Sequence, residues 1–327
     1  MTVYRSIHAA GALALAGAGT GMGIAAISGV TGVSGSDPAG WAALFAVVVV
    51  PLGYVAARET RWALRTDEFD VTRTDLGNAV AVAAGAPVTY VLSIEVGLGP
   101  VVASALVGLL AYVLSEKYAA PAYCGSFVGM ATPAAGADVV AVSAAGVVSA
   151  GVFVAAKRGF NGFGGKLGTT AFIGCLAVAA LGGFGPGSGT VPAGDVAAVL
   201  VVVAALAAAA TFVVSVGLDH GPVVGSAIIG LLAGLVCPPL LAAGDTVAAV
   251  AFCASFAGMA TPERIPGTGA MIVAGAVSGL VFVGAAPYFV GFGGKLGTIA
   301  FTACLFTAGI RSLGKTLVPS PLAGVSG

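Results

Sequence analysis

The amino-acid sequence predicts an all-α integral membrane protein with about 12 transmembrane helices, arranged as an N-terminal two-helix hairpin and a 5+5 inverted structural repeat. Three observations carry this prediction. First, 58% of the 327 residues are hydrophobic and only 8% are charged, whereas a soluble domain carries roughly 25% charged residues. Second, apolar segments of membrane-spanning length recur along the chain. Third, the motifs of one five-helix unit return in the next.

The expected spans follow one another with a single long polar interruption. A bilayer core needs about 20 apolar residues per helix. The first apolar run is too long for the core of a signal peptide and has no clear cleavage site, so we interpret it as a span. Nine charged residues between Arg58 and Asp75 predict a cytoplasmic linker. The expected spans are residues 8–33, 39–57, 77–97, 99–115, 119–133, 136–156, 166–184, 195–217, 221–242, 246–261, 268–288 and 295–313.

Two motifs define the repeat. Cys124–Pro133 (CGSFVGMATP) returns as Cys253–Pro262 (CASFAGMATP), and Gly162–Thr169 (GFGGKLGT) returns unchanged as Gly291–Thr298, both at an offset of 129. Residues 124–175 and 253–304 share 29 identities in 52 ungapped positions. We therefore expect five parts: a hairpin at 1–57, a charged linker at 58–76, a first membrane repeat at 77–190, a second at 191–315 and a tail at 316–327.

The repeat also predicts close helix packing. Gly275 and Gly279 form a Gly-x-x-x-Gly pair, and Gly146 and Ala150 are their counterparts in the first copy. Small residues at this spacing let two helix backbones approach closely in a membrane. This face is expected to serve packing rather than function.

The distribution of basic residues predicts that the two copies are inverted. Lys and Arg prefer cytoplasmic loops. If all twelve segments span and the N-terminus is inside, twelve of the 13 Lys and Arg residues lie inside and only Lys295 lies outside. If the short helices ending at Pro133 and Pro262 are re-entrant instead, the split falls to 9 inside and 4 outside. We therefore expect five spans per copy, both termini in the cytoplasm and a location in the cell membrane.

Inverted repeats are the architecture of many transporters, with the substrate at the repeat interface. The predicted function is a transporter or channel for a small solute, with a slight preference for a small anion. The alternative is a non-transporting membrane scaffold or assembly factor. A polar path between the repeats distinguishes the two, because a scaffold should be dry throughout.

The first candidate site is the Ser-Phe-x-Gly-Met-Ala-Thr-Pro segment of each copy. Pro and Gly free backbone carbonyl groups, which at membrane depth must face protein or water, and the hydroxyl groups can bind an ion or a solute. We expect the two Met-Ala-Thr-Pro segments to approach each other near the bilayer centre. The alternative is a packed helix kink. The substrate-binding candidates here are Ser126, Gly129, Thr132, Pro133, Ser255, Gly258, Thr261 and Pro262.

The second candidate site is the Phe-Gly-Gly-Lys-Leu-Gly-Thr segment, which opens a helix in each copy. Free N–H groups at a helix N-terminus attract anions. Gly165 with Lys166, and Gly294 with Lys295, add a flexible turn and a full positive charge to such a start. Leu167 stands where a P-loop has Ser or Thr, so the segment is not a nucleotide-binding loop. The alternative is a lysine that reaches lipid headgroups.

The third candidate consists of Glu95 in the first copy and Asp219 with His220 in the second. Each precedes a Gly-Pro helix start, and ionisable groups beside a span are candidates for gating or coupling. The alternative is a set of solvated turn residues.

Several other functions are not expected. Histidine occurs only at His8 and His220, no HExxH or GxSxG motif is present, and the acidic residues lie at the ends of spans, so neither an enzyme nor a metal or cofactor site is predicted. No basic stripe with interleaved aromatic residues indicates nucleic acid. The five cysteines are interpreted as small buried residues. The expected partners are a small solute or ion and the lipid bilayer, and a homo-oligomer is left open.

Overall fold

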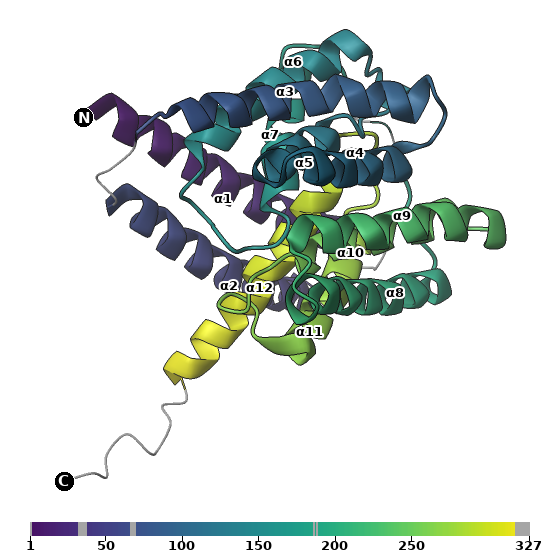
Figure 1. Cartoon of the computed structure of the whole chain (residues 1–327). Coiled ribbons are helices and arrows are strands. Elements are labelled where there is room, and N and C mark those ends of the chain that lie inside the picture. The colour runs from purple at the N-terminus through teal and green to yellow at the C-terminus, as the bar shows by residue number, and fades with distance from the viewer. Residues whose placement is uncertain (1, 32–37, 66–69, 186, 188, 318–327) are drawn as a thin grey trace.

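The computed structural model describes residues 2–31, 38–65, 70–185, 187 and 189–317. In these residues the regular structure is helical and comprises twelve α-helices, as the sequence predicts (Figure 1). The helices are α1 (Thr2–Thr31), α2 (Pro38–Arg65), α3 (Arg73–Ile94), α4 (Pro100–Leu114), α5 (Glu116–Val128), α6 (Val139–Ala155), α7 (Lys166–Ala180), α8 (Gly194–Phe212), α9 (Pro222–Leu240), α10 (Gly244–Gly258), α11 (Gly267–Gly284) and α12 (Lys295–Leu317).

Within the described residues, six stretches are long and apolar enough to cross a membrane, judged by length and composition. Helices α4, α6, α7 and α10 are apolar but only 15–17 residues long. A 15-residue helix is about 22 Å long, which is less than the roughly 30 Å of a hydrocarbon core. Length alone therefore supports six of the twelve expected spans. The six stretches are Ser6–Val30, Arg73–Ile94, Gly194–Gly217, Pro222–Leu240, Gly267–Gly284 and Lys295–Lys315.

Many large hydrophobic side chains lie on the outer surface. Large hydrophobic side chains such as those of Val113, Leu114 and Leu240 are more than 70% exposed. Water would penalise so many exposed apolar side chains. Together with the six long apolar helices, this surface is compatible with a membrane protein.

Two helix boundaries illustrate how local sequence fixes the elements. Gly99 and Gly221 adopt φ angles of +74° and +80°, which glycine tolerates, and the proline that follows each begins α4 or α9. Helix α2 continues to Arg65, eight residues beyond the expected end of the second span at 57. Residues 66–69 of the expected linker and residues 318–327 of the expected tail lie outside the described residues.

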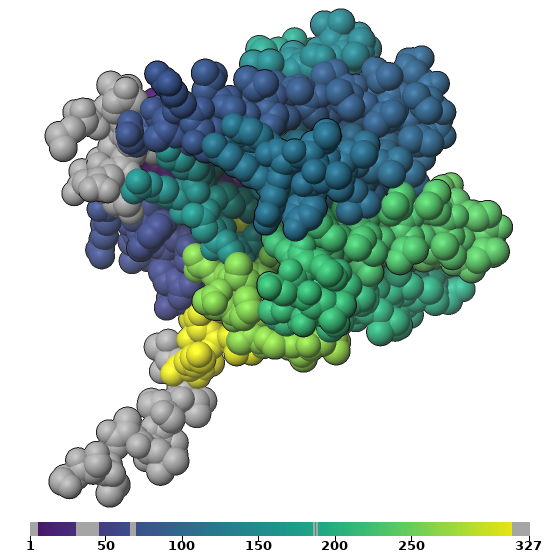
Figure 2. Space-filling model, viewed as in Figure 1, coloured from purple at the N-terminus to yellow at the C-terminus, as the bar shows by residue number. Residues whose placement is uncertain are grey.

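Helices α3–α7 and α8–α12 form two groups that make the same internal contacts. The first helix of each group packs on the third and fourth, the second on the third, and the fourth on the fifth. The predicted small-residue face is confirmed, since a Cβ atom on Gly275 or Gly279 would come within 2.7 Å of α8. Figure 2 shows the first group, in blue and teal, beside the second group, in green.

The contacts between the two groups join equivalent helices. Helix α4 packs on its counterpart α9, and α7 packs on its counterpart α12. At the second contact the backbones of Gly168 and Gly297 touch: a Cβ atom built on either glycine would lie 2.5 Å from the Cα of the other. The contact is therefore reciprocal, with each copy offering the same surface to the other.

Helix α1 lies along the α7–α12 contact and reaches equivalent positions of both groups (Figure 1). Near its start, a Cβ atom on Gly11 would lie 2.7 Å from the backbone of Ala155. Near its end, one on Gly29 would overlap the carbonyl oxygen of Gly284, which is the counterpart of Ala155. The N-terminal hairpin thus covers one side of the paired repeats.

Candidate functional site

Two cavities open at the interface between the helix groups. The Lys295 cavity has a volume of about 450 Å³, and the Lys166 cavity has a volume of about 420 Å³. Their walls are built from equivalent positions of the two copies. In the Lys295 cavity these are Pro100, Val101, Met130, Thr132, Phe282, Gly291, Phe292, Gly294, Lys295 and Leu296, and in the Lys166 cavity they are Pro222, Val223, Met259, Thr261, Phe153, Gly162, Phe163, Gly165, Lys166 and Leu167.

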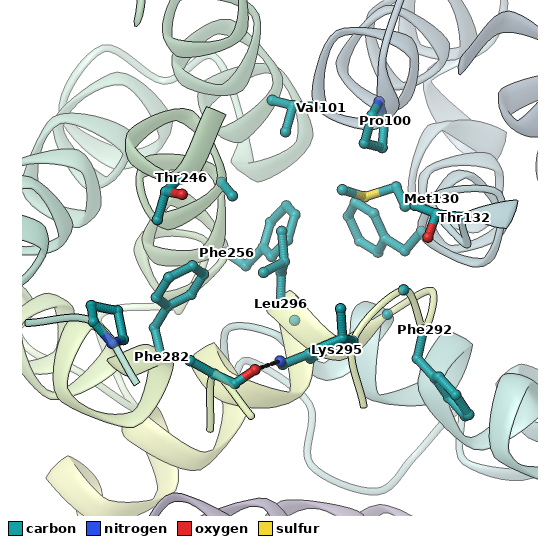
Figure 3. A pocket seen from close by; sticks show the side chains of 18 of the residues that line it. Pro100, Val101, Met130, Thr132, Thr246, Phe256, Phe282, Phe292, Lys295 and Leu296 are labelled. Atoms are coloured by element: carbon teal, nitrogen blue, oxygen red, sulfur yellow. Dashed lines mark hydrogen bonds between the residues drawn. The ribbon is translucent and has the colours of Figure 1, made fainter. Parts of the chain in front are cut away.

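The Lys295 cavity is mostly apolar. Figure 3 shows Met130 and Thr132 on one side and Thr246 and Phe282 opposite, with Lys295 below them at the start of α12. The Lys295 Nζ atom lies 3.5 Å from a carbonyl oxygen, that of Ala286. Because this hydrogen bond is long, the ammonium group keeps donors for a ligand in the cavity.

The Lys166 cavity is more polar. The Lys166 ammonium group donates a hydrogen bond of 2.5 Å to Oδ1 of Asn161. Asn78 and Lys157 also line this cavity. Lys157 in turn forms an ion pair with Asp75, at 2.8 Å between Nζ and Oδ2.

A left-handed glycine turn places each lysine. Gly165 and Gly294 have φ angles of +79° and +77° and precede the first residues of α7 and α12. The neighbouring Gly164 packs so closely on α10 that a Cβ atom would lie 2.4 Å from the carbonyl oxygen of Phe256. Only glycine fits this approach, and the turn leaves a helix N-terminus and its lysine facing the cavity, an arrangement that attracts anions.

The Thr-Pro segment of each copy binds the Gly-Phe-Gly-Gly loop of the other. The Thr132 N–H group donates to the carbonyl oxygen of Gly291 at 3.0 Å, and Thr261 donates to Gly162 at 2.9 Å. Thr132 and Thr261 line different cavities. Each Thr-Pro end therefore meets the loop of the opposite copy, because the glycines there leave room for its backbone, while the two motif segments meet each other at the Phe127 and Phe256 rings.

Two aromatic rings, those of Phe127 and Phe256, lie between the cavities, and the rings of Tyr123 and Phe252 pack against them. Tyr123, Phe127, Phe252 and Phe256 are each at most 1% exposed, and we call them the aromatic barrier. The Phe127 and Phe256 ring centroids are 4.5 Å apart, and both residues line both cavities. Placing an ion in apolar surroundings costs on the order of 20 kcal/mol in the idealised limit. An unpaired uncharged polar group costs about 2–7 kcal/mol.

Sequence reasoning missed the barrier, although its signal was present. Phe127 and Phe256 belong to the repeated Ser-Phe-x-Gly motif. The hydroxyl, Gly and Pro residues of that motif give the stronger local signal, because they offer ligands and free carbonyl groups. A phenylalanine in a membrane protein ordinarily packs in the core, and only the contact across the interface distinguishes Phe127 and Phe256 from such residues.

The motif serines connect helices within the buried core. Ser126 bonds Ser104 with 2.8 Å between their Oγ atoms, and Ser255 bonds Ser226 at the same distance. The Tyr123 hydroxyl lies 3.0 Å from Oγ of Ser226. All four serines are fully buried and none lines either cavity. In this conformation Ser126 and Ser255 lie behind the barrier rather than on a cavity wall.

The remaining motif residues lie away from the cavities. A Cβ atom on Gly129 would come within 2.4 Å of α3, and one on Gly258 within 2.5 Å of α8, so both glycines serve close helix packing. Pro133 and Pro262 are exposed at the ends of their segments and line neither cavity.

The proposed gating residues also lie outside both cavities. Glu95 is exposed at the end of α3, and Asp219 and His220 are exposed in the turn before α9. Asp219 adopts a φ angle of +57°, which Asp tolerates better than most residues. In the described residues, the structure does not bring Glu95, Asp219 or His220 to the cavity walls.

An ionic bridge borders the Lys166 cavity. Arg264 donates two hydrogen bonds to Glu59, at 2.7 and 2.9 Å, and a third from Nε to the carbonyl oxygen of Asn161 at 2.9 Å. Its guanidinium also lies 4.4 Å from the Phe163 ring centroid. Bidentate Arg–carboxylate pairs have strict geometry. The bridge therefore fixes the hairpin and both helix groups to one another beside this cavity.

No group of three His, Cys, Asp or Glu residues in the described part of the chain could hold a metal ion. The five cysteines form no disulfide; four are buried and Cys237 is partly buried. Comparison with family models, curated proteins and solved structures finds no match for the chain.

Proposed function

We propose that this chain is a membrane permease that moves a small solute between the Lys166 cavity and the Lys295 cavity. The observation that carries the proposal is the pair of equivalent cavities, each with a lysine at a helix N-terminus, that share the Phe127 and Phe256 rings as their dividing wall. A scaffold would need neither cavity nor lysine inside its core.

The reciprocal contacts support an inverted arrangement. When residue i of one copy meets residue j of the other and j meets i in return, the copies are related by a two-fold axis. The Gly168–Gly297 contact and the two Thr–Gly hydrogen bonds have this form. With five helices per copy and the basic residues as distributed, we place the axis in the membrane plane. The Lys166 cavity then opens to the cytoplasm and the Lys295 cavity to the outside.

For the solute to pass from one cavity to the other, the rings of the aromatic barrier must move. Phe127 and Phe256 separate the two cavities, so rotation of their rings is the smallest motion that joins them. Side-chain rotation of this kind distinguishes a gated channel from a transporter in which whole helices rock. In a gated channel and in a rocking transporter alike, the lysines attract the solute.

The test uses single cysteines in the two cavities. Thr132→Cys and Thr261→Cys are placed in a background where the five native cysteines are replaced, and each is treated with a membrane-impermeant thiol reagent in oriented proteoliposomes. We expect Thr132→Cys to react only from outside and Thr261→Cys only from inside, with loss of solute flux in both. Val96→Cys, exposed outside the cavities, is the control that should react without loss of flux. Reaction of both cavity cysteines from one side would contradict the inverted arrangement.

A further inference from the structure

We infer that the solute is a small weak acid that enters a cavity as its anion and crosses the aromatic barrier as the uncharged acid. The inference rests on the proposed function and adds the class of substrate. It follows from a contrast between the cavities, which carry positive charge, and the barrier, which carries none.

Both cavities disfavour cations. Each contains one lysine at a helix N-terminus; Lys157, which also lines the Lys166 cavity, is paired with Asp75 and adds no net charge. No carboxylate occurs among the described residues that line either cavity. The positive charge and the helix N-termini therefore attract anions and repel cations at both entrances.

The barrier disfavours ions of either sign. Its four rings are buried, and the faces of aromatic rings carry partial negative charge, which repels anions. The nearby hydroxyl groups of Tyr123, Ser226 and Ser255 are already bonded to one another. An anion would lose its hydration here and gain no compensating charge, whereas an uncharged acid loses only hydrogen bonds.

A weak acid satisfies both regions. In the first cavity the anion takes one proton from the aqueous phase, which forms an O–H bond and removes its charge. The acid passes the barrier, and in the second cavity the same O–H bond breaks and the proton returns to water. One proton and one anion cross together, so no net charge moves. In each cavity the lysine is the counter-charge for the anion, and the proton that crosses comes from the aqueous phase.

Proteoliposomes loaded with a pH-sensitive dye test the inference. The probes are lactate as the weak acid, nitrate as the anion of a strong acid, and urea as an uncharged solute, each against protein-free liposomes and under a potassium-clamped membrane potential. We expect lactate flux at least tenfold above the protein-free rate, with acidification of the lumen. The flux should rise about tenfold for each unit by which external pH falls, in step with the protonated fraction, and should be independent of the clamped potential. Nitrate should not exceed its protein-free rate.

A barrier variant sharpens the test. The double variant Phe127→Ala, Phe256→Ala removes the two rings between the cavities and should admit nitrate. The double variant Phe127→Leu, Phe256→Leu keeps apolar side chains of similar size there and should not admit nitrate. The leucine pair also guards against failure of the alanine pair to fold.

The outcomes separate this inference from the proposed function. Nitrate flux in the unmodified protein equal to lactate flux, or lactate flux set by the membrane potential, overturns the inference and leaves transport standing. Urea flux without lactate flux also overturns the inference and leaves transport standing, because the lysines then do not select anions. Absence of flux for all three probes overturns transport and this inference together.

Discussion

The Lys166 cavity and the Lys295 cavity share a frame and differ in their walls. The lysine, its glycine turn, the methionine, the threonine and the dividing phenylalanine occur in both. Lys157 and Asn161 of the first cavity, however, correspond to Ala286 and Val290 of the second. The glycine turns and the lysines are thus kept between the copies, whereas the polar side chains that surround Lys166 have no counterpart around Lys295. The comparison indicates that the fold requires the lysine and its glycine turn in both copies, and that the other lining residues changed independently in each cavity.

The edges of the two cavities differ as well. The segment between the helix groups borders the Lys295 cavity: Thr190 and Pro192 line it, and the Gly187 N–H group donates to the carbonyl oxygen of Val290 at 3.0 Å. The Lys166 cavity is bordered instead by the ionic bridge between Arg264 and Glu59. The segment that borders the Lys295 cavity is therefore uncharged, whereas an ion pair borders the Lys166 cavity.

The largest expected effect comes from the reciprocal glycine contact, which tests the shared frame. Gly168→Ala and Gly297→Ala each place a Cβ atom 2.5 Å from the opposite Cα, a distance that forces the backbones apart. Overpacking in a core costs about 1–3 kcal/mol and sometimes more. Because each substitution strains the same contact, we expect equal losses of thermal stability in detergent and a double variant that is less than additive.

Gly151→Ala is the matched control for this prediction. Gly151 lies in α6 with no atom within 4 Å of an added Cβ, so alanine should be neutral or slightly stabilising through its higher helix propensity. Clearly unequal effects of Gly168→Ala and Gly297→Ala would show that the two copies do not share one contact.

The intermediate effect tests the difference between the cavity walls. Lys295 is the only cation lining its cavity among the described residues, whereas Lys166 has Lys157 beside it. Lys295→Ala should lower flux about tenfold or more, equivalent to about 1.4 kcal/mol of lost binding, and Lys166→Ala should lower it less. Arginine should rescue in part, because it keeps the charge but not the compact shape.

Proteoliposome flux, normalised to folded protein, measures this effect. Lys315→Ala, an exposed lysine of α12 outside both cavities, is the control and should leave flux unchanged. If neither cavity lysine affects the flux of any transported anion, the lysines are anchors for lipid headgroups and the turn that carries them serves packing.

Local patterns were sufficient to predict most of the fold. The apolar runs predict all twelve helices, because hydrophobicity and Gly-Pro boundaries act over a few residues. The repeat predicts the equivalence of the two helix groups, and the small residues at Gly275 and Gly279 predict where α11 meets α8. Lengths were less well predicted: an apolar run of 17 residues at 99–115 yields a 15-residue helix.

The site was predicted only in part because its contacts join distant segments. The lysines and their glycine turns were identified, since a charge beside a glycine pair in an apolar chain is a local signal. The aromatic barrier was not, because Phe127 and Phe256 meet only when the two copies pair. The same pairing buries Ser126 and Ser255, which the sequence alone marked as ligand groups.

The smallest expected effect concerns the single chemical difference within the aromatic barrier. Tyr123 of the first copy corresponds to Phe252 of the second, and its hydroxyl lies 3.0 Å from Oγ of Ser226. Tyr123→Phe makes the copies identical at this position. Ser226 keeps its bond to Ser255 at 2.8 Å, so no buried hydroxyl loses its last partner. We therefore expect a loss of about 1 kcal/mol or less in the free energy of unfolding.

The flux of this variant decides what the Tyr123 hydroxyl does. If it only joins α5 to α9, flux should stay within about twofold of the unmodified protein, in keeping with a small structural effect. Phe252→Tyr is the matched control, because it adds a hydroxyl at the equivalent position, toward the serine pair of Ser104 and Ser126. A tenfold fall in flux for Tyr123→Phe with unchanged stability would contradict the structural role. The hydroxyl would then be a hydrogen-bonding partner of the solute at the barrier, and the two copies would differ in function at their centre as well as in their walls.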